Sequence, residues 1–347
     1  MPIGHSRTNV FGLPALLLLA AGLGLRDVDT EEPCSAPAAM AATPRRPFVS
    51  EHRYRIVGKV RLLLFWVGSD DVGGARATWR ADDGDGRAFS LLIGSDPRRA
   101  PRGINEWGYI HERVRGDNAR VFGVRTVTEP DSPDDATAKL EARKDRTTFG
   151  ALCAQVNARE AQASIATLSA PSDVTYQHFD RLLDAVAASS AWDFRQVTRP
   201  DDAAPGFLTA LDRLMTITAD ATRARRSGFP NTIGYVYKDS TYDLNARRVQ
   251  SIAELKTEAG VFRNLLRAEF TIRNRQTNDS TRFNMTYGLD GALAGVPVEA
   301  TYQPNWWLKV RLELDDRSQL PADPSGDEIL RQRMDDVCAL ALRIGNC

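Results

Sequence analysis

The sequence has few of the side chains from which metal and redox sites are built. It contains four cysteines and four histidines in 347 residues, and no two cysteines form a CxxC pair. A thiolate metal or redox site needs cysteines at short, regular spacing, and a histidine-based metal site would here need distant segments to converge. The composition therefore excludes a disulfide-rich scaffold and predicts neither a cofactor nor a metal site.

The motifs that define several large enzyme classes are also absent. The chain has no GxSxG, HExxH or SxxK motif, no phosphate-binding P-loop and no GxGxxG after a strand. An excess of one charge is missing too, since 45 Lys and Arg residues balance 45 Asp and Glu residues. A balanced charge gives no general attraction to polyanions, so no nucleic-acid partner is predicted. Together these absences favour a non-enzymatic protein.

The first 42 residues carry the most specific signal of the sequence. His5 and Arg7 precede an uninterrupted apolar run over residues 11–25, and small residues lead to Ala39-Met40-Ala41. This order is typical of a secretory signal peptide with an A-x-A cleavage site. The run is shorter than the roughly 20 residues of a membrane span, so no integral span is expected after cleavage. We therefore predict a periplasmic or secreted protein, and the cleavage point stays open between Ala21 and Ala41.

Export permits disulfides, but the pairing cannot be deduced from spacing. The cysteines are Cys34, Cys153, Cys338 and Cys347. If cleavage removes Cys34, one of the other three is unpaired. Cys338 and Cys347 would lie about 13 Å apart on a straight helix, so the chain must bend after Gly345 for them to bond. The alternative is that one of them bonds Cys153.

Residues 43–129 show the alternation of a half-buried antiparallel sheet. Apolar residues alternate with polar ones over residues 52–67, which predicts one long strand. Residues 70–74 and 82–86 are rich in Asp and Gly and predict turns, as does the 116–118 triplet. Further strands are expected over 75–80, 89–93, 104–115 and 119–128. The economical interpretation is a five-stranded meander.

Residues 130–230 are predicted to form an acidic linker followed by a mainly helical segment. Helical spacing of apolar residues follows Ser172-Asp173 and recurs from Pro205 to Arg226. Residues 147–158 and 161–169 fit either a hairpin or a helix, and we favour strands.

Residues 231–347 return to strand alternation and end in a helix. Strands are expected over 233–237, 242–244, 262–272, 281–287, 296–302 and 306–314, with a short helix possible over 252–257. In the last strand, Lys309, Arg311 and Glu313 are predicted to face water. Ser325 to Glu328 resemble a capping box for the terminal helix.

The predicted fold class is α+β. Two antiparallel, curved β-sheet blocks, half-barrel or lipocalin-like in pattern, flank the helical middle segment, and a helix ends the chain. The blocks form either two sheets or the two halves of one sheet.

Aromatic side chains are the main candidates for a binding surface. Many lie on predicted strands, and a concave aromatic surface can hold a lipid or another apolar molecule. Ordinary core packing is the alternative, because strands are rich in aromatics. The candidate ligand-binding residues are Trp66, Trp79, Trp107, Tyr109, His111, Tyr302, Trp306 and Trp307.

No catalytic set of residues can be assigned. Glu106 and Glu112 lie on one face of a predicted strand about 20 Å apart, too far to act on one bond, and we expect such carboxylates to be solvated. The Asp-rich stretch at 82–86 resembles half of a calcium loop, but the distal Glu of such a loop is missing, so a solvated turn is the better interpretation.

Three functions remain from the sequence. The leading hypothesis is an exported bacterial-type, non-enzymatic envelope protein that binds an apolar or amphipathic ligand, or an envelope component, on a curved sheet. One alternative is an exported hydrolase of glycan or ester bonds that uses Asp or Glu acids. The other is a structural or scaffold protein with a fully packed interior.

Overall fold

One continuous sheet, antiparallel except where β9 pairs with β10, organises the described part of the chain. The structure is a computed structural model that describes residues 49–62, 65–81, 86–96, 98–100, 106–127, 146–226, 228–305, 308–316 and 320–344. The sheet has fifteen strands in the order β8-β7-β6-β5-β4-β3-β2-β1-β15-β14-β13-β12-β11-β10-β9. Strands that are consecutive in the sequence pair with each other, except β8 and β9, and β1 also pairs with β15. The two predicted blocks are therefore two halves of a single sheet.

The strands divide between these halves. The first half contains β1 (Val49–Leu62), β2 (Phe65–Ala81), β3 (Arg87–Ser95), β4 (Trp107–Arg115), β5 (Asn118–Thr126), β6 (Arg146–Val156), β7 (Glu160–Pro171) and β8 (Asp193–Thr198). The second half contains β9 (Ala203–Ala204), β10 (Thr232–Tyr237), β11 (Ser240–Thr257), β12 (Gly260–Asn274), β13 (Ser280–Gly288), β14 (Pro297–Asn305) and β15 (Leu308–Leu314).

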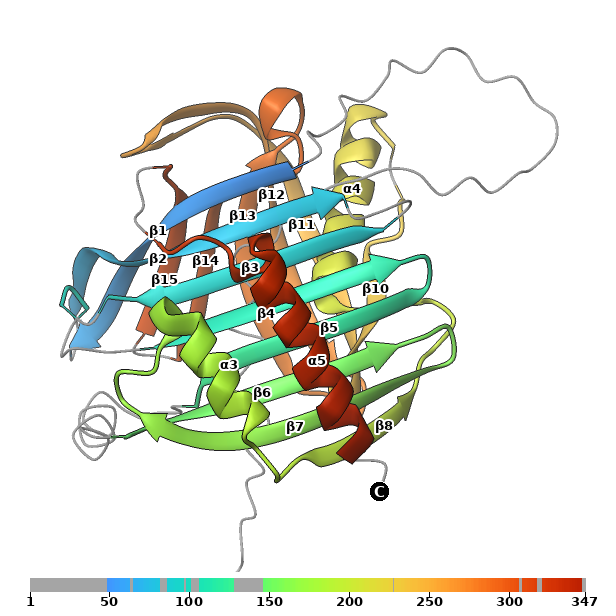
Figure 1. The fold of residues 1–347 in the computed structure, drawn as a ribbon. Helices are drawn as coiled ribbons and strands as arrows, with labels where there is room; N and C mark the ends of the chain where they lie inside the picture. Colours follow the sequence, from blue (N-terminus) through green and yellow to red (C-terminus); the bar gives the residue numbers. More distant parts are fainter. Residues whose placement is uncertain are drawn as a thin grey trace, which may run out of the picture.

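Helices lie on both sides of the first half of the sheet (Figure 1). They are α3 (Phe179–Ala187), α4 (Phe207–Arg223) and α5 (Glu328–Ile344), with short 3-10 turns η2 (Tyr176–His178), η3 (Gly291–Leu293) and η4 (Pro324–Gly326). None of the described helices is long and apolar enough to cross a membrane.

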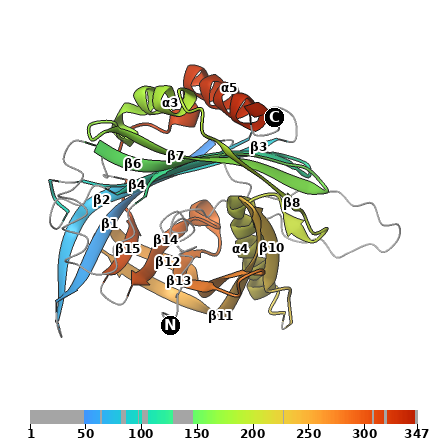
Figure 2. The same ribbon diagram turned by 90° about the horizontal axis from the view of Figure 1, so that it is seen from below.

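The molecule has three layers (Figure 2). The helices α3 and α5 cover the outer face of the first half, and the second half curls under its inner face with α4 between them. Alternate residues of each strand therefore enter different cores. On β4, Ile110 and Val114 belong to the inner core, whereas Trp107 and Tyr109 belong to the outer core beneath the helices.

The first two strands divide at a different place from the one predicted. β1 ends at Leu62 and β2 already begins at Phe65, so the predicted strand over 52–67 was wrong. The Asp and Gly residues at 70–74 lie inside β2, where the register with β1 shifts between Ile56 and Gly58. Asp71 there has φ 60°. Residues that favour positive φ serve β-bulges as well as turns, which explains the error.

The remaining strands of the meander agree with the prediction. β3, β4 and β5 occupy the expected segments, and Gly116, at φ 54°, begins the two-residue connection between β4 and β5. In the middle segment the favoured strands at 147–158 and 161–169 are confirmed as β6 and β7, so this segment is less helical than predicted. The helices following Ser172 and Pro205 are confirmed as α3 and α4.

Two predictions for the C-terminal block were wrong. Residues 252–257 form the end of β11 and not a helix. Glu313 of β15 does not face water but is 3% exposed, and the Nε of Arg55 on β1 donates to it at 2.8 Å. Periodicity could not reveal this, because the partner that buries the carboxylate comes from the opposite end of the chain. The terminal helix is confirmed as α5, and Asp327 caps it by accepting from the backbone N–H groups of Ile329 and Leu330.

A disulfide fastens α5 to the outer face of the sheet. Cys153 of β6 bonds Cys338 of α5, with their Cα atoms 5.0 Å apart and a separation of 185 positions in the sequence. Of the pairings left open by the spacing, the structure contains the one between the middle and the end of the chain. Cys34 and Cys347, like the predicted signal peptide, lie outside the described residues.

Reduction of this disulfide should destabilise the fold. A crosslink across so long a loop restricts the unfolded chain, and its loss typically costs about 2–4 kcal/mol. We expect dithiothreitol to lower the free energy of unfolding of the wild type by this amount in urea titrations. A double variant, Cys153→Ser with Cys338→Ser, should be less stable from the start and insensitive to dithiothreitol; a similar response of both proteins would contradict the prediction.

Candidate functional site at the sheet seam

The two halves of the sheet meet again along a line opposite the β1–β15 pair. We call this line the seam: the inner face of β4–β7 on one side, and the start of α4 with the end of β10 on the other. Within the described residues, β8 and β9 are the two edges of the sheet and do not pair with each other. The seam is therefore closed by side chains and not by a strand ladder.

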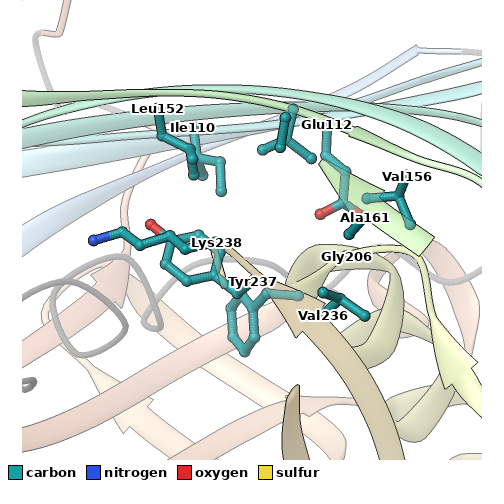
Figure 3. A pocket seen from close by; sticks show the side chains of 12 residues that line it. Ile110, Glu112, Leu152, Val156, Ala161, Gly206, Val236, Tyr237 and Lys238 are labelled. Carbon is teal, nitrogen blue, oxygen red and sulfur yellow. The ribbon is translucent and has the colours of Figure 1, made fainter. Parts of the chain in front are cut away.

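A pocket lies in the seam (Figure 3). Its closed volume is about 10 Å³, and with the solvent space at its mouth it measures about 320 Å³. A volume of 10 Å³ has room for about one water molecule. The lining residues are Ile110, Glu112, Val121, Leu152, Ala154, Val156, Ala161, Gly206, Phe207, Val236, Tyr237 and Lys238.

Glu112 is a fully buried carboxylate at one end of this pocket. It lies on β4 between inner-core positions and is 0% exposed. Its oxygens accept hydrogen bonds from the backbone N–H groups of Leu208 (3.1 Å) and Thr209 (3.0 Å) and from the Thr209 hydroxyl. The N-cap residue of α4, Gly206, supplies no side-chain cap. Glu112 therefore caps α4 from a strand about a hundred residues earlier, where the helix dipole favours a negative charge.

The environment of Glu112 acts on its pKa in two directions. Burial raises the pKa above its ordinary value, while the hydrogen bonds from Thr209 and Leu208 and the charge of Arg213 lower it, and burial is the larger effect. The carboxyl group thus holds a proton more readily in the folded protein than in water.

Glycine is required at position 206 because the carboxylate occupies the space beside it. A Cβ at Gly206 would lie 2.3 Å from Oε2 of Glu112. Neither neighbour can yield easily, since the helix N-terminus and the carboxylate hold each other in place.

Arg199 forms a second link across this region. Its side chain is 5% exposed and donates to the carbonyl groups of Asp117 (2.6 Å) and Asn157 (2.9 Å), in the turns that follow β4 and β6. Its Nε donates to the carbonyl of Ala203 in β9 at 2.8 Å. The edge strand β9 is thus attached to the first half of the sheet through one guanidinium.

The predicted ligand-binding residues do not share one face. Trp79 and Tyr302 are buried in the inner core, whereas Trp107 and Tyr109 are buried in the outer core. His111 shares the strand face of Tyr109, so it points toward the helix-covered side rather than into the concave interior. The backbone of Trp66 pairs with Arg61 in the β1–β2 ladder, and Trp306 and Trp307 lie outside the described residues.

His111 belongs to a buried polar cluster on the outer face. Asp323 accepts from the hydroxyl groups of Ser90, Tyr109 (3.2 Å) and Ser325 (2.9 Å). His111 lies opposite Ser90 on the neighbouring strand and is 4% exposed, and neither of its ring nitrogens has a hydrogen-bond partner. Because no bond joins the imidazole to a serine or to the carboxylate, this cluster lacks the geometry of a hydrolytic triad.

The sequence did not identify the residues of the seam. Glu112 was expected to be a solvated strand carboxylate, and Gly206 and Lys238 carried no signal of their own. One signal was present in the sequence. Pro205-Gly206 precedes a predicted helix without Ser, Thr, Asp or Asn at the cap position, so the cap must come from another part of the chain. Within the described residues no group of three or more His, Cys, Asp and Glu side chains could hold a metal ion.

Comparisons with known proteins identify no family. No family model and no curated protein matches the sequence. Among solved structures, the chain is similar to a β-barrel-like protein of a domain of unknown function, DUF1849, from Brucella abortus. The two sequences are 10% identical, and the TM-score is 0.40 over 76% of this chain and 95% of that one. A candidate lipoprotein from Parabacteroides distasonis matches at 9% identity and a TM-score of 0.26, over 78% of this chain and 96% of that one. Likeness at this level carries no functional argument.

Replacement of Gly206 should test the cap. Gly206→Ala places a methyl group against the Glu112 carboxylate, and we expect a loss of about 1–3 kcal/mol in the free energy of unfolding. Gly150→Ala is the matched control, because a Cβ there would meet its nearest neighbour at an ordinary 3.5 Å. Equal stability of the two variants in urea titrations would show that Glu112 is not fixed against the helix.

Acid should destabilise the protein through His111. Burial lowers the pKa of this histidine to about 4 in the fold, with Arg113, Arg80 and Arg331 adding to the effect and Asp323 opposing it. The unfolded chain, with a histidine pKa near 6.5, binds this proton first, so stability is lost as pH falls from about 6.5 toward 4. We expect His111→Gln to remove about 2–3 kcal/mol of this pH dependence.

The matched control for this measurement is His178→Gln, since His178 is exposed. Both variants and the wild type are compared by urea titrations at several pH values. An unchanged slope in the His111 variant would contradict the assignment.

Proposed function

We propose that this chain is an exported, non-enzymatic envelope protein that binds an amphipathic small molecule in the seam. The observation that carries the proposal is the pocket itself, whose walls are mostly apolar side chains from β4–β7 and whose polar groups are few and placed at its ends. This division of chemistry is typical of sites for small amphipathic ligands.

Export is supported by two independent observations. The first 25 residues have the order of a signal peptide. The described part of the chain contains the Cys153–Cys338 disulfide, and disulfides persist in oxidising compartments such as the periplasm.

The closed volume requires the seam to widen when a ligand enters. Since β8 and β9 do not pair, widening breaks no strand ladder there. It separates apolar side chains, at about 25 cal/mol for each Å² exposed, and loosens the bonds of Glu112 and Arg199. A ligand chain of several methylene groups restores the buried apolar area at about 0.8 kcal/mol per group, so binding can compensate for the opening.

A structural role is the second candidate, and the small closed volume favours it. A scaffold would keep the seam permanently packed and would bind no apolar probe. The two functions therefore differ in a measurable property of the purified protein.

Fluorescence of N-phenyl-1-naphthylamine, an apolar dye, tests the proposal. We expect the wild type to enhance the dye's emission, and Ala154→Phe, which fills the pocket from β6, to weaken binding at least tenfold. The control is Ala187→Phe, at the exposed end of α3, which should bind as the wild type does. Thermal unfolding of each variant confirms that it is folded.

If the wild type does not enhance the emission of the dye, the result would contradict the proposal and favour the structural role. Native mass spectrometry of protein purified from its own envelope gives a second measurement. We expect the wild type to release a bound small molecule on collisional activation, and we expect this molecule to be missing from Ala154→Phe.

A further inference from the structure

The hairpin formed by β1 and β2 projects beyond its neighbours in the sheet. β3 pairs with β2 only from Gly73 onward, whereas β2 begins at Phe65, where it pairs with Leu62 of β1. Figure 2 shows these two strands extending past the rest of the sheet. On its other side, β1 is accompanied by β15 as far as the pair of Val60 with Leu308. We call this projecting part the hairpin end, and it comprises residues 59–62, 65–68 and 308–309.

The sequence of the hairpin end is apolar at every position around its turn. Residues 62–67 read Leu-Leu-Leu-Phe-Trp-Val, and residues 306–308 read Trp-Trp-Leu. Of these, residues 63–64 and 306–307 lie outside the described residues. Strand side chains alternate between two faces, so an unbroken apolar run suits a strand that is covered on both faces. On a hairpin that projects past β3, such a run marks a surface for a membrane or for another protein.

Two lysines lie directly behind the apolar run. Lys59 of β1 and Lys309 of β15 are opposite each other in the strand register, and both are exposed. Neither forms an ion pair with a described residue, and residues 59–69 and 305–310 contain no Asp or Glu. Like charges that face each other across two strands destabilise a sheet. An anionic surface outside the protein would therefore stabilise both lysines.

The spacing of lysine and apolar residues fits a membrane interface. Lys59 precedes Leu62 by three residues, which is about 10 Å along a strand. Interfacial elements bury their apolar side chains roughly 5–10 Å into the boundary between headgroups and acyl chains. Lysine reaches the phosphate groups by extending its aliphatic chain, and tryptophan is enriched at the same depth. A lipid surface supplies anionic groups on all sides without a complementary shape, which favours it over a protein partner.

We propose that the hairpin end attaches this protein to the surface of a membrane that contains anionic lipids. The apolar residues of the hairpin end enter the boundary of the acyl region, and Lys59 and Lys309 contact the phosphate groups. This inference does not depend on ligand binding in the seam, because no residue of the hairpin end lines the pocket.

Sedimentation with vesicles tests the attachment. The purified protein is mixed with vesicles of phosphatidylcholine alone, or with vesicles that also contain phosphatidylglycerol, and the bound fraction is measured. We expect binding to the anionic vesicles to be about tenfold tighter or more, and to weaken as salt is added.

The lysines are tested by the double variant Lys59→Gln with Lys309→Gln. It should bind anionic vesicles about 25-fold more weakly, about fivefold for each lysine, and neutral vesicles within about twofold of the wild type. Its melting temperature should not fall, because the substitutions remove a repulsion. The matched control is Lys256→Gln, an exposed lysine of β11 that pairs with Glu254. This control should bind both kinds of vesicle as the wild type does.

The apolar run is tested by the double variant Phe65→Ser with Trp66→Ser. It should lose binding to both kinds of vesicle, and thermal unfolding confirms that it is folded. The conservative variant Trp66→Phe gives a second measurement. It should bind as the wild type does, but brominated lipids should quench less of its tryptophan emission. Trp192→Phe, which alters a residue packed against the outer core, is the control and should leave the quenched emission unchanged.

Three results would overturn the proposal. A wild type that stays in the supernatant with both kinds of vesicle is not attached by this surface. Undiminished binding of the lysine double variant to anionic vesicles would remove the role of Lys59 and Lys309. Light scattering could instead show oligomers that only the Phe65 and Trp66 double variant dissolves, which would assign the hairpin end to a second copy of the chain. Ala154→Phe should bind vesicles as the wild type does, so this proposal and the proposed function fail separately.

Discussion

The bond between the Glu112 carboxylate and the start of α4 is the constraint on which the interior of this protein depends. One side chain gives the helix its missing cap, fixes the distance between the two halves of the sheet and closes one end of the pocket. Because the carboxylate is buried, removing either partner would leave the other unsatisfied in an apolar surrounding. Gly206 is part of the same arrangement, since any larger residue would occupy the place of the carboxylate.

The sequence predicted local structure well and the assembly of the halves poorly. Alternation along β12 to β15 and helical spacing in α4 and α5 depend on neighbouring residues, so they are visible in one segment. The β1–β15 pair depends on segments 258 positions apart at Arg55 and Glu313, which no pattern within a segment records. The same limit explains why Glu313 was expected in water, and why the Asp and Gly residues near 71 suggested a turn when they form a bulge.

The residues that the sequence suggested for a binding surface are not those that line the seam pocket. Aromatic residues on the strands were expected to line a concave surface. In the structure, odd-numbered and even-numbered residues of a strand enter two different cores. The alternation in the sequence does not show which set faces the concave side. Trp107 and Tyr109 pack under α3 and α5, and their even-numbered neighbours Ile110 and Glu112 face the pocket. Only the position of the covering helices, α3 and α5, decides this, and it follows from tertiary contacts that include the Cys153–Cys338 bond.

The place of β1 and β15 in the sheet has a consequence for how the polypeptide acquires its shape. Within the described residues, thirteen strand pairings join consecutive strands, and all of these except the parallel β9–β10 pair are antiparallel, so most of each half can form from neighbouring segments. The central pairing must wait for β15, the last strand of the sheet in the sequence. Contacts of such long range form slowly. Until then both β1 and β15 present bare edges to the surroundings, which makes this interval the one in which an assembling chain most needs protection from its neighbours.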